Sequence, residues 1–209
     1  MKPLETERLN LRKFMRDDFV ALYNFLRRPD SSIYSYYWPD NEEGTWAFIN
    51  ESISKAEMSP CYDIQYAAVT KAGNELIGSC NFTLSSDSNI GWIVSKDYWN
   101  QGYGTEMAKA MLGLGFEEFN LRRIVACCDA ENVGSYRIME KIGMRREGMF
   151  LESRRAHKQS SKKYSNEVVY AIDKEESVAV DAMPAHSNTW AEMIELFGVT
   201  QKILYDRDE

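Results

Sequence analysis

The segment at residues 99–109, WNQGYGTEMAK, places Gly102 and Gly104 one residue apart in front of a predicted helix. A strand that enters a glycine-rich turn and then a helix brings unpaired N–H groups and the positive end of the helix dipole to one point. Such a turn binds phosphate groups, because glycine lets a phosphate reach the backbone. The same spacing also occurs in tight strand-to-helix turns that bind nothing, so the rest of the chain is needed to separate the two interpretations.

The turn differs from the two common nucleotide-binding motifs. The sequence contains no GxxxxGK[ST] motif, and the segment lacks the third glycine of a dinucleotide fingerprint. A second strand followed by a helix comes one unit later, at residues 127–144, CCDAENVGSYRIMEKIGM. Two parallel neighbouring strands that end at helix N-termini form a cleft, so we expect a binding cleft between these two units.

The charge of the chain is acidic overall but unevenly distributed. A net charge of -7 disfavours bulk binding to nucleic acid or to an anionic membrane, and it favours a small cationic substrate. Between residues 121 and 146, however, basic side chains outnumber acidic ones, and this excess predicts a local anion site. The residues are Arg122, Arg123, Arg137, Lys141, Arg145 and Arg146, against Asp129, Glu131 and Glu140.

Length and composition indicate one cytoplasmic domain with an appendage. The chain has 209 residues, enough to bury a core without disulfides. No apolar run approaches the roughly 20 residues of a membrane span, and the start, MKPLETERLN, lacks the apolar stretch of a secretory signal. The four cysteines show neither metal-ligand spacing nor a disulfide framework, so we expect reduced core thiols and no metal site.

Hydrophobic periodicity predicts the order β-α-α-β-β-β-α-β-α-β-β, which indicates an α+β or mixed α/β domain. The three strands within residues 62–95 are joined by short turns and should form an antiparallel meander. Residues 1–174 form the predicted domain. Residues 175–209 are predicted to be a linker followed by an amphipathic helix that carries Trp190, Met193, Ile194 and Phe197. The remaining predicted strands are residues 7–14, 122–130, 144–151 and 167–172, and the predicted helices are residues 17–28, 42–55, 105–119 and 132–143.

Residues 90–148 resemble the GNAT superfamily of acetyl-CoA-dependent N-acetyltransferases, and most closely its RimJ/RimL-like branch, the ribosomal-protein N-terminal acetyltransferases. The segments ETERLNLRKFMRDDF (5–19) and YYWPD (36–40) extend the likeness to residues 5–173. The resemblance implies the GNAT fold, a mixed and mostly antiparallel sheet of about seven strands flanked by about four helices. The C-terminal helical extension falls outside this pattern.

The resemblance also implies acetyl-CoA as cosubstrate and assigns residues to it. The turn would hold the coenzyme diphosphate, the strand before it would pair with the pantetheine arm, and the next helix would contribute an amide and a cation. These residues are Gln101, Gly102, Tyr103, Gly104 and Thr105 for the diphosphate; Trp92, Ile93 and Val94 for the arm; and Asn132 and Arg137 from the helix. Asn132 can equally serve as the helix N-cap. For Arg137 a solvated helix face is the more frequent explanation.

Attack of an amine on a thioester needs a neutral amine, stabilisation of the oxyanion and a proton for the departing thiolate. The family's usual proton-donating tyrosine corresponds to Met139 here, and the RimJ/RimL-like branch instead implies Ser135, with Tyr136 next in line. Glu152 is the candidate base, although the pattern favours a solvated strand residue at this position. An aromatic acceptor wall is implied at Tyr36, Tyr37 and Trp38.

The sequence therefore predicts direct acetyl transfer to a primary amine, without a metal. The acceptor would be a protein N-terminal α-amine or a small polyamine or aminoglycoside-like amine, and the chain could act as a homodimer. The alternative is a coenzyme-A-binding regulatory module with little or no catalysis, because the tyrosine is missing. A thiol redox protein would rest on Cys127 and Cys128 alone.

Overall fold

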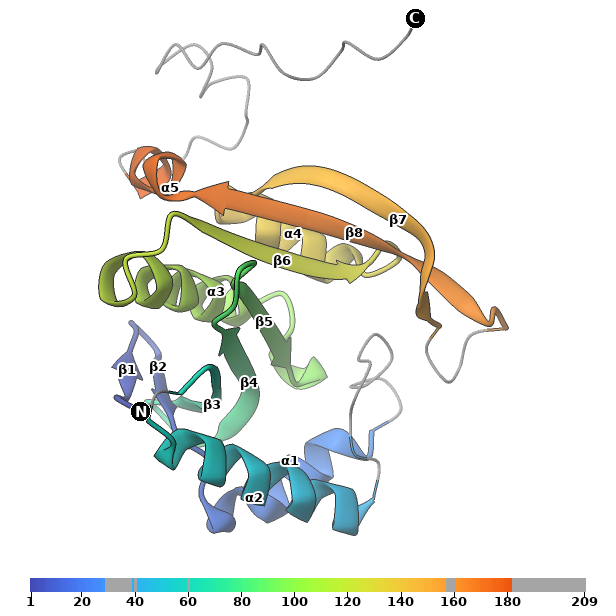
Figure 1. Cartoon of the computed structure of the whole chain (residues 1–209). Coiled ribbons are helices and arrows are strands. Elements are labelled where there is room, and N and C mark those ends of the chain that lie inside the picture. The colour runs from blue at the N-terminus through green and yellow to red at the C-terminus, as the bar shows by residue number, and fades with distance from the viewer. Residues whose placement is uncertain (29–38, 40, 60, 157–160, 182–209) are drawn as a thin grey trace, which may run out of the picture.

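The fold is an eight-stranded sheet with helices on both faces, shown in Figure 1. A computed structural model describes residues 1–28, 39, 41–59, 61–156 and 161–181, and all structural statements refer to these residues. The strand order is β1-β2-β3-β4-β5-β6-β8-β7. The strands are β1 (Leu4–Glu5), β2 (Leu9–Arg12), β3 (Asp63–Thr70), β4 (Leu76–Thr83), β5 (Asn89–Val94), β6 (Arg123–Asp129), β7 (Arg145–Arg155) and β8 (Tyr164–Asp173).

The helices agree with the predicted order, and their ends are set by local signals. They are α1 (Phe19–Leu26), α2 (Glu42–Glu57), α3 (Tyr103–Gly113), α4 (Val133–Lys141) and α5 (Lys174–Asp181). The predicted helix at 105–119 begins two residues earlier and continues after Gly113 as one π-helical turn, Leu114–Glu118. The predicted N-cap of α4 is confirmed, because the Asn132 side chain accepts a hydrogen bond from Ser135 N at 3.1 Å.

β5 and β6 diverge from each other, and this divergence opens the sheet. The meander β3-β4-β5 is antiparallel, as predicted, whereas β5 and β6 run parallel. Their one registered pair within the described residues is Asn89 with Val125, near the start of both strands. The remaining residues of β5 and β6 therefore separate into a V whose open end lies at the strands' C-terminal ends. The sheet also gains β1, a two-residue strand that the sequence did not predict.

Two apolar clusters cover the two faces of the sheet. The larger one joins α3, the π turn and α4 to side chains such as Ile90 and Val94 of β5. The smaller one lies under α1 and α2 and includes Phe14, Leu22 and Ile49, with Ile93 of β5 packed against it. Because neighbouring strand residues point to opposite faces, β5 contributes to both clusters.

The C-terminal boundary differs from the prediction. The first part of the predicted linker is helical, since residues Lys174–Asp181 form α5. The helix is fixed at its start by Glu176, whose carboxylate accepts a hydrogen bond from Asp173 N at 2.9 Å. The predicted amphipathic helix of the C-terminal segment lies outside the described residues. None of the described helices is long and apolar enough to cross a membrane.

Two glycines near the end of α3 should respond oppositely to alanine. A Cβ at Gly115 would lie 2.5 Å from Ile124 Cδ1 and 2.8 Å from Phe82 Cε2, whereas a Cβ at Gly113 would meet nothing within 4 Å. We expect Gly115→Ala to lower the free energy of unfolding by about 1–3 kcal/mol through overpacking. Gly113→Ala should raise it by about 0.5–1 kcal/mol, because glycine costs more conformational entropy on folding. Urea denaturation measures both, and equal effects would contradict this packing.

Candidate active site

The glycine turn leads directly into α3, and Gly102 stands at the N-cap position of that helix. Gly102 has φ 85° and ψ -4°, in the left-handed region that glycine adopts at little cost. The first hydrogen bond of α3 runs from Glu106 N to Gly102 O at 3.0 Å. The N–H groups of Tyr103, Gly104 and Thr105 therefore precede the helical ladder, at the positive end of the helix dipole.

The two glycines serve different purposes. Gly102 is required by its positive φ, whereas Gly104 is required by close packing. A Cβ at Gly104 would lie 2.6 Å from Ile138 Cδ1 of α4 and 3.6 Å from Val94 Cγ2 of β5. Gly104 thus lets α4 and the open strand β5 approach the turn, so that turn, strand and second helix meet at one place.

Arg8, which precedes β2, holds this turn from a distant part of the sequence. Its Nη1 donates to Gln101 O at 2.9 Å, and its guanidinium pairs with Glu106 at 2.7 Å. The same guanidinium lies 4.2 Å from the ring centroid of Tyr103. Thr6 adds a hydrogen bond from its hydroxyl to Glu106 at 2.5 Å. Sequence reasoning missed Arg8, because no local pattern links a residue before the second strand to a turn more than ninety positions away.

The free edge of β5 presents main-chain groups to the open V. Ser95 N donates to Ile77 O at 2.7 Å, so the alternation of an antiparallel pair directs Ile93 toward β4 and Trp92 and Val94 away from it. One of these groups is already used, because Trp99 Nε1 donates to Val94 O at 2.7 Å. The N–H groups of Trp92 and Val94 remain on the side that faces the V.

Ser135 lies on the opposite wall of the V, in the first turn of α4. It is half-buried, and its neighbour across the helix start is Cys128 of β6. Burial raises the pKa of Cys128 to about 11, and the Ser135 hydroxyl opposes that shift. The Asn132 side chain is engaged as the cap of the same helix. The Ser135 hydroxyl and the capped start of α4 therefore lie together beside Cys128, near the C-terminal end of β6.

The comparisons with known proteins agree with this geometry. The sequence profile of the acetyltransferase (GNAT) domain matches residues 8–145, more than half of the chain. The chain belongs to the GNAT acetyltransferase family. A Bacillus subtilis (strain 168) relative, the uncharacterized N-acetyltransferase YnaD, is 38% identical over 154 residues, which are 70% of this chain and 85% of that protein. This chain is accordingly a GNAT N-acetyltransferase with the predicted fold.

Solved structures support the same fold. An acetyltransferase (GNAT family) from Bacillus anthracis has a TM-score of 0.72 at 34% identity, covering 84% of this chain and 100% of that one. RimL, described as a ribosomal L7/L12 alpha-N-protein acetyltransferase, has a TM-score of 0.70 at 17% identity, covering 82% of this chain and 94% of that one. At that identity the second likeness shows the fold alone. Enzymes of the GNAT family use acetyl-CoA.

Several of the predicted site residues of this GNAT chain are exposed or are already paired. Arg137 pairs with Glu140 at 2.8 Å on the surface of α4, as in the solvated-face interpretation. Glu152 lies on an exposed irregularity of β7 with φ 49°, where its N–H donates to the Asn166 side chain at 2.9 Å. Its carboxylate is solvent-exposed. The predicted acceptor wall at Tyr36, Tyr37 and Trp38 lies outside the described residues.

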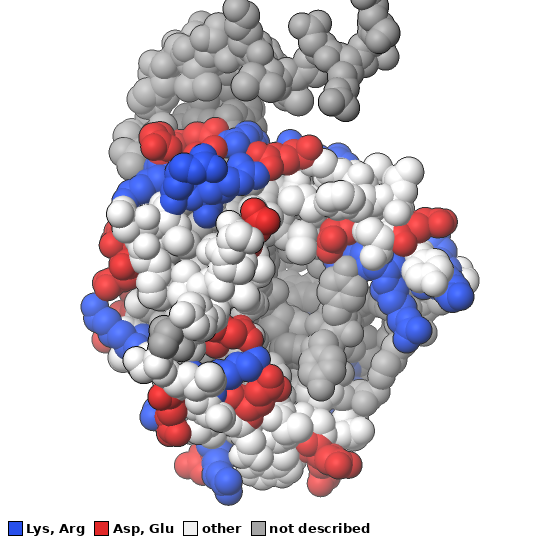
Figure 2. Space-filling view, viewed as in Figure 1, with Lys and Arg blue, Asp and Glu red and all other residues white. Residues whose placement is uncertain are grey.

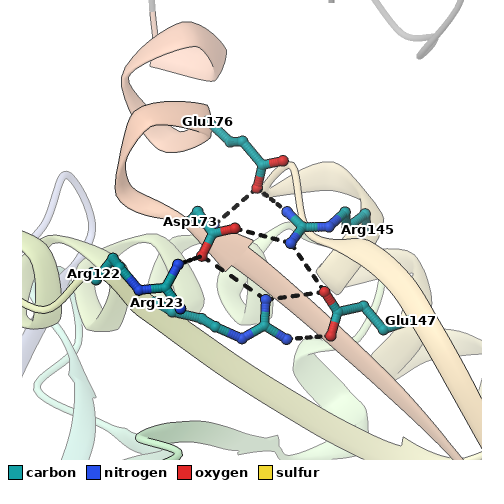
Figure 3. Close-up of polar contacts among 6 residues, drawn as sticks. All are labelled: Arg122, Arg123, Arg145, Glu147, Asp173 and Glu176. Carbon is teal, nitrogen blue, oxygen red and sulfur yellow. Dashed lines mark hydrogen bonds and ion pairs between the residues drawn. The ribbon is translucent and has the colours of Figure 1, made fainter. Parts of the chain in front are cut away.

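The predicted anion site in the basic stretch is wrong for three of its arginines. Figure 3 shows them in an ion-pair network with three carboxylates at the N-terminal end of β6, away from the open end of the V. Figure 2 shows the same region near α5 as blue side chains lying beside red ones. The excess of arginine therefore joins β6, β7, β8 and α5 instead of binding an anion. The network consists of Arg122, Arg123, Arg145, Glu147, Asp173 and Glu176.

The prediction of four core thiols is only partly correct. Cys80 and Cys128 are buried and Cys61 is half-buried, but Cys127 is exposed. Cys127 and Cys128 are neighbours on β6, so they point to opposite faces of the sheet. Cys128 faces α4, and Cys127 faces the other side.

The contact between Arg8 and Glu106 predicts a pH-dependent stability. Partial burial opposes ionisation, yet hydrogen bonds from Thr6 and Arg8 hold the pKa of Glu106 below its usual 4.5. The ionised Glu106 carboxylate therefore stabilises the folded protein above pH 4.5. This stabilisation is lost as the pH falls through the lowered pKa. We expect Glu106→Gln to lower the urea midpoint at pH 7 and to have a smaller effect at pH 3.5.

The control variant is Glu117→Gln, which removes an exposed carboxylate from the π turn. It should leave the urea midpoint nearly unchanged at both pH values. An equal loss for Glu106→Gln at pH 7 and pH 3.5 would show that its carboxylate is not stabilised in the folded protein.

Proposed function

We propose that this GNAT enzyme transfers an acetyl group directly from acetyl-CoA to a primary amine. The observation that carries the proposal is the coincidence of three features at the V. The left-handed Gly102 turn opens α3, β5 directs the N–H groups of Trp92 and Val94 away from β4, and Ser135 lies in the first turn of α4 beside the end of β6. A protein N-terminal α-amine is the first candidate acceptor, and a small polyamine or aminoglycoside-like amine is the second.

The residues present fit the coenzyme. The turn from Gln101 to Thr105 offers backbone N–H groups to a diphosphate, and the absence of a side chain at Gly102 keeps them accessible. Trp92 and Val94 would pair with the amides of the pantetheine arm as a further strand would. When bound, acetyl-CoA supplies the activated thioester. Arg8 fixes the turn in place through Gln101 O and Glu106.

The two sides of the V would contribute different catalytic groups. The N–H of Val94 would stabilise negative charge on the thioester oxygen, since it points into the V. The Ser135 hydroxyl, on the side of β6, would donate a proton to the departing sulfur and would recover one from the nitrogen that becomes positively charged when the amine attacks. Direct transfer needs no covalent intermediate on the protein, because both groups and the acceptor can reach one thioester at the same opening.

The acceptor proposal rests on charge and on relatives. The net charge of -7 attracts cationic amines. The RimL likeness in fold and a Bacillus subtilis (strain 168) relative described as the putative ribosomal N-acetyltransferase YdaF favour a protein N-terminus and the RimJ/RimL-like branch. That relative is 28% identical over 120 residues, half of this chain and 66% of its own length.

The first test is release of coenzyme A thiol from acetyl-CoA with short peptides of varied first residue, with spermidine and with kanamycin. We expect release with at least one amine. Gly102→Ala should raise the KM for acetyl-CoA by about tenfold or more, because alanine resists the left-handed conformation and would displace the diphosphate. Gly113→Ala is the matched control and should leave the KM within twofold.

Binding of acetyl-CoA without thiol release for any amine would favour the alternative, a coenzyme-A-binding module. An unchanged KM in Gly102→Ala would show that the turn does not hold the coenzyme.

Ser135→Ala tests the proton donor. Loss of a general acid typically costs about 10²–10⁴ in rate, so we expect kcat to fall at least tenfold while the KM for acetyl-CoA stays within twofold. Val133→Ala, an exposed change one half-turn earlier on α4, is the control and should retain the wild-type kcat. A wild-type kcat in Ser135→Ala would assign the proton to another group, with Tyr136 as the next candidate.

A further inference from the structure

We propose that Trp99 is a positioning residue for acetyl transfer. Its indole N–H holds the main-chain carbonyl of Val94, so that the edge of β5 presents the Val94 N–H to the thioester without a competing acceptor beside it. The inference rests on the proposed function, in which this N–H stabilises the thioester oxygen. It gives a role to a side chain to which the sequence assigned none.

A short turn brings the Trp99 side chain back to β5. Between the strand and the glycine segment the chain forms one 3₁₀ turn, Lys96–Tyr98. The backbone of Trp99 closes this turn, because its N–H donates to Lys96 O at 3.1 Å. The ring then returns to the strand, where Nε1 donates to Val94 O at 2.7 Å. One side chain therefore connects the strand that would pair with the pantetheine arm to the turn that would hold the diphosphate.

The register of β4 and β5 directs both main-chain groups of Val94 into the V. Val94 is opposite Gly78. This pair exchanges no hydrogen bonds, because Ser95 N donates to Ile77 O at 2.7 Å, so the N–H and C=O of Val94 both point away from β4. A Cβ at Gly78 would overlap Ile93 O. The peptide group that carries the Val94 N–H therefore packs directly on the backbone of β4, and Trp99 holds the next peptide group from the other side.

The indole removes an electrostatic conflict at this position. The N–H and C=O of Val94 point the same way, so the carbonyl oxygen brings partial negative charge close to the place where the oxyanion would develop. An indole N–H is a donor only, and its hydrogen bond to Val94 O offsets this charge. Val94 is 9% exposed, and a buried carbonyl without a donor also costs stability. Trp99 thus satisfies the carbonyl and leaves the neighbouring N–H for the substrate.

The same hydrogen bond favours one register of an extended ligand on β5. The edge that faces the V offers the N–H and C=O of Trp92, followed by those of Val94. Because the indole already donates to Val94 O, an amide N–H of the ligand would pair with Trp92 O. A thioester carbonyl that follows this amide would then reach the Val94 N–H. The indole therefore favours the register that aligns the reacting carbonyl with its donor.

Three substitutions of Trp99 separate the donor from the ring. Trp99→Gln keeps an N–H at the same number of bonds from Cα as the indole Nε1, and Trp99→Met has a similar length without a donor. Trp99→Phe keeps a ring without a donor, and it replaces Trp99→Met if that variant does not fold. Tyr98→Phe is the control from the same turn, because it removes only the hydroxyl that donates to Glu75.

Steady-state thiol release measures the first effect, with the amine that the wild type acetylates fastest. Loss of the donor should lower kcat about tenfold in Trp99→Met and Trp99→Phe, less than the loss of an oxyanion donor itself. The KM for acetyl-CoA should stay within twofold, because the glycine turn keeps its backbone donors. Trp99→Gln should retain kcat within threefold, and Tyr98→Phe should retain the wild-type value. A purely structural role of the ring would instead lower kcat equally in Trp99→Gln and Trp99→Met.

Backbone amide NMR gives a second readout that needs no turnover. Acetyl-CoA and coenzyme A differ only in the acetyl group, so the difference between their two spectra reports the contact with the thioester carbonyl. We expect the Val94 N–H proton signal to move to lower field with acetyl-CoA than with coenzyme A, in the wild type and in Trp99→Gln. Trp99→Met should lose at least half of this difference.

The inference is overturned if Trp99→Gln and Trp99→Met have equal kcat, or if the Val94 signal responds to the two compounds equally in the wild type or identically in both variants. Failure of the proposed function has a different signature, because it is absence of thiol release in the wild type with every amine. In that case the NMR comparison alone decides whether Trp99 positions the Val94 N–H at the thioester.

Discussion

The separation of β5 from β6 is the constraint on which the site depends. The two strands share one registered pair, Asn89 with Val125, and then diverge. Each strand consequently keeps an edge whose main-chain groups have no partner strand beyond that point. In a closed sheet such groups would form hydrogen bonds with the neighbouring strand, and no extended ligand could pair with them. Here they line an opening through the sheet, with the starts of two helices on one face.

Packing holds the helix starts at this opening. Gly104 allows Ile138 of α4 to approach the turn, and Arg8 connects the turn to the N-terminal strands through Glu106. The turn is therefore fixed by contacts from two separate parts of the chain before any ligand arrives. Such preorganisation lowers the entropic cost of binding, because the backbone donors are already oriented.

The sequence predicted the features that depend on local patterns. The order of the elements, the meander, the cap at Asn132 and the glycine turn follow from periodicity and from residue types with strong backbone preferences. It could not predict the partners of the arginines, because Asp173 and Glu176, which pair with Arg145, lie 28 and 31 positions later in the chain. Large sequence separation is also why the sequence did not predict the role of Arg8 or the register that places Asp129 opposite Glu167. Long-range pairing, and not residue type, determines which charged side chains are able to bind a ligand.

The central claim is that the backbone from Gln101 to Thr105 and the open edge of β5 bind the coenzyme. Backbone amide NMR of the labelled protein, titrated with coenzyme A, tests it most directly. The account predicts the largest shifts at Tyr103, Gly104 and Thr105 and at Trp92 and Val94, with smaller shifts at Ile93, whose N–H faces β4. Largest shifts at Arg122, Arg123 and Arg145, with the turn unaffected, would contradict it.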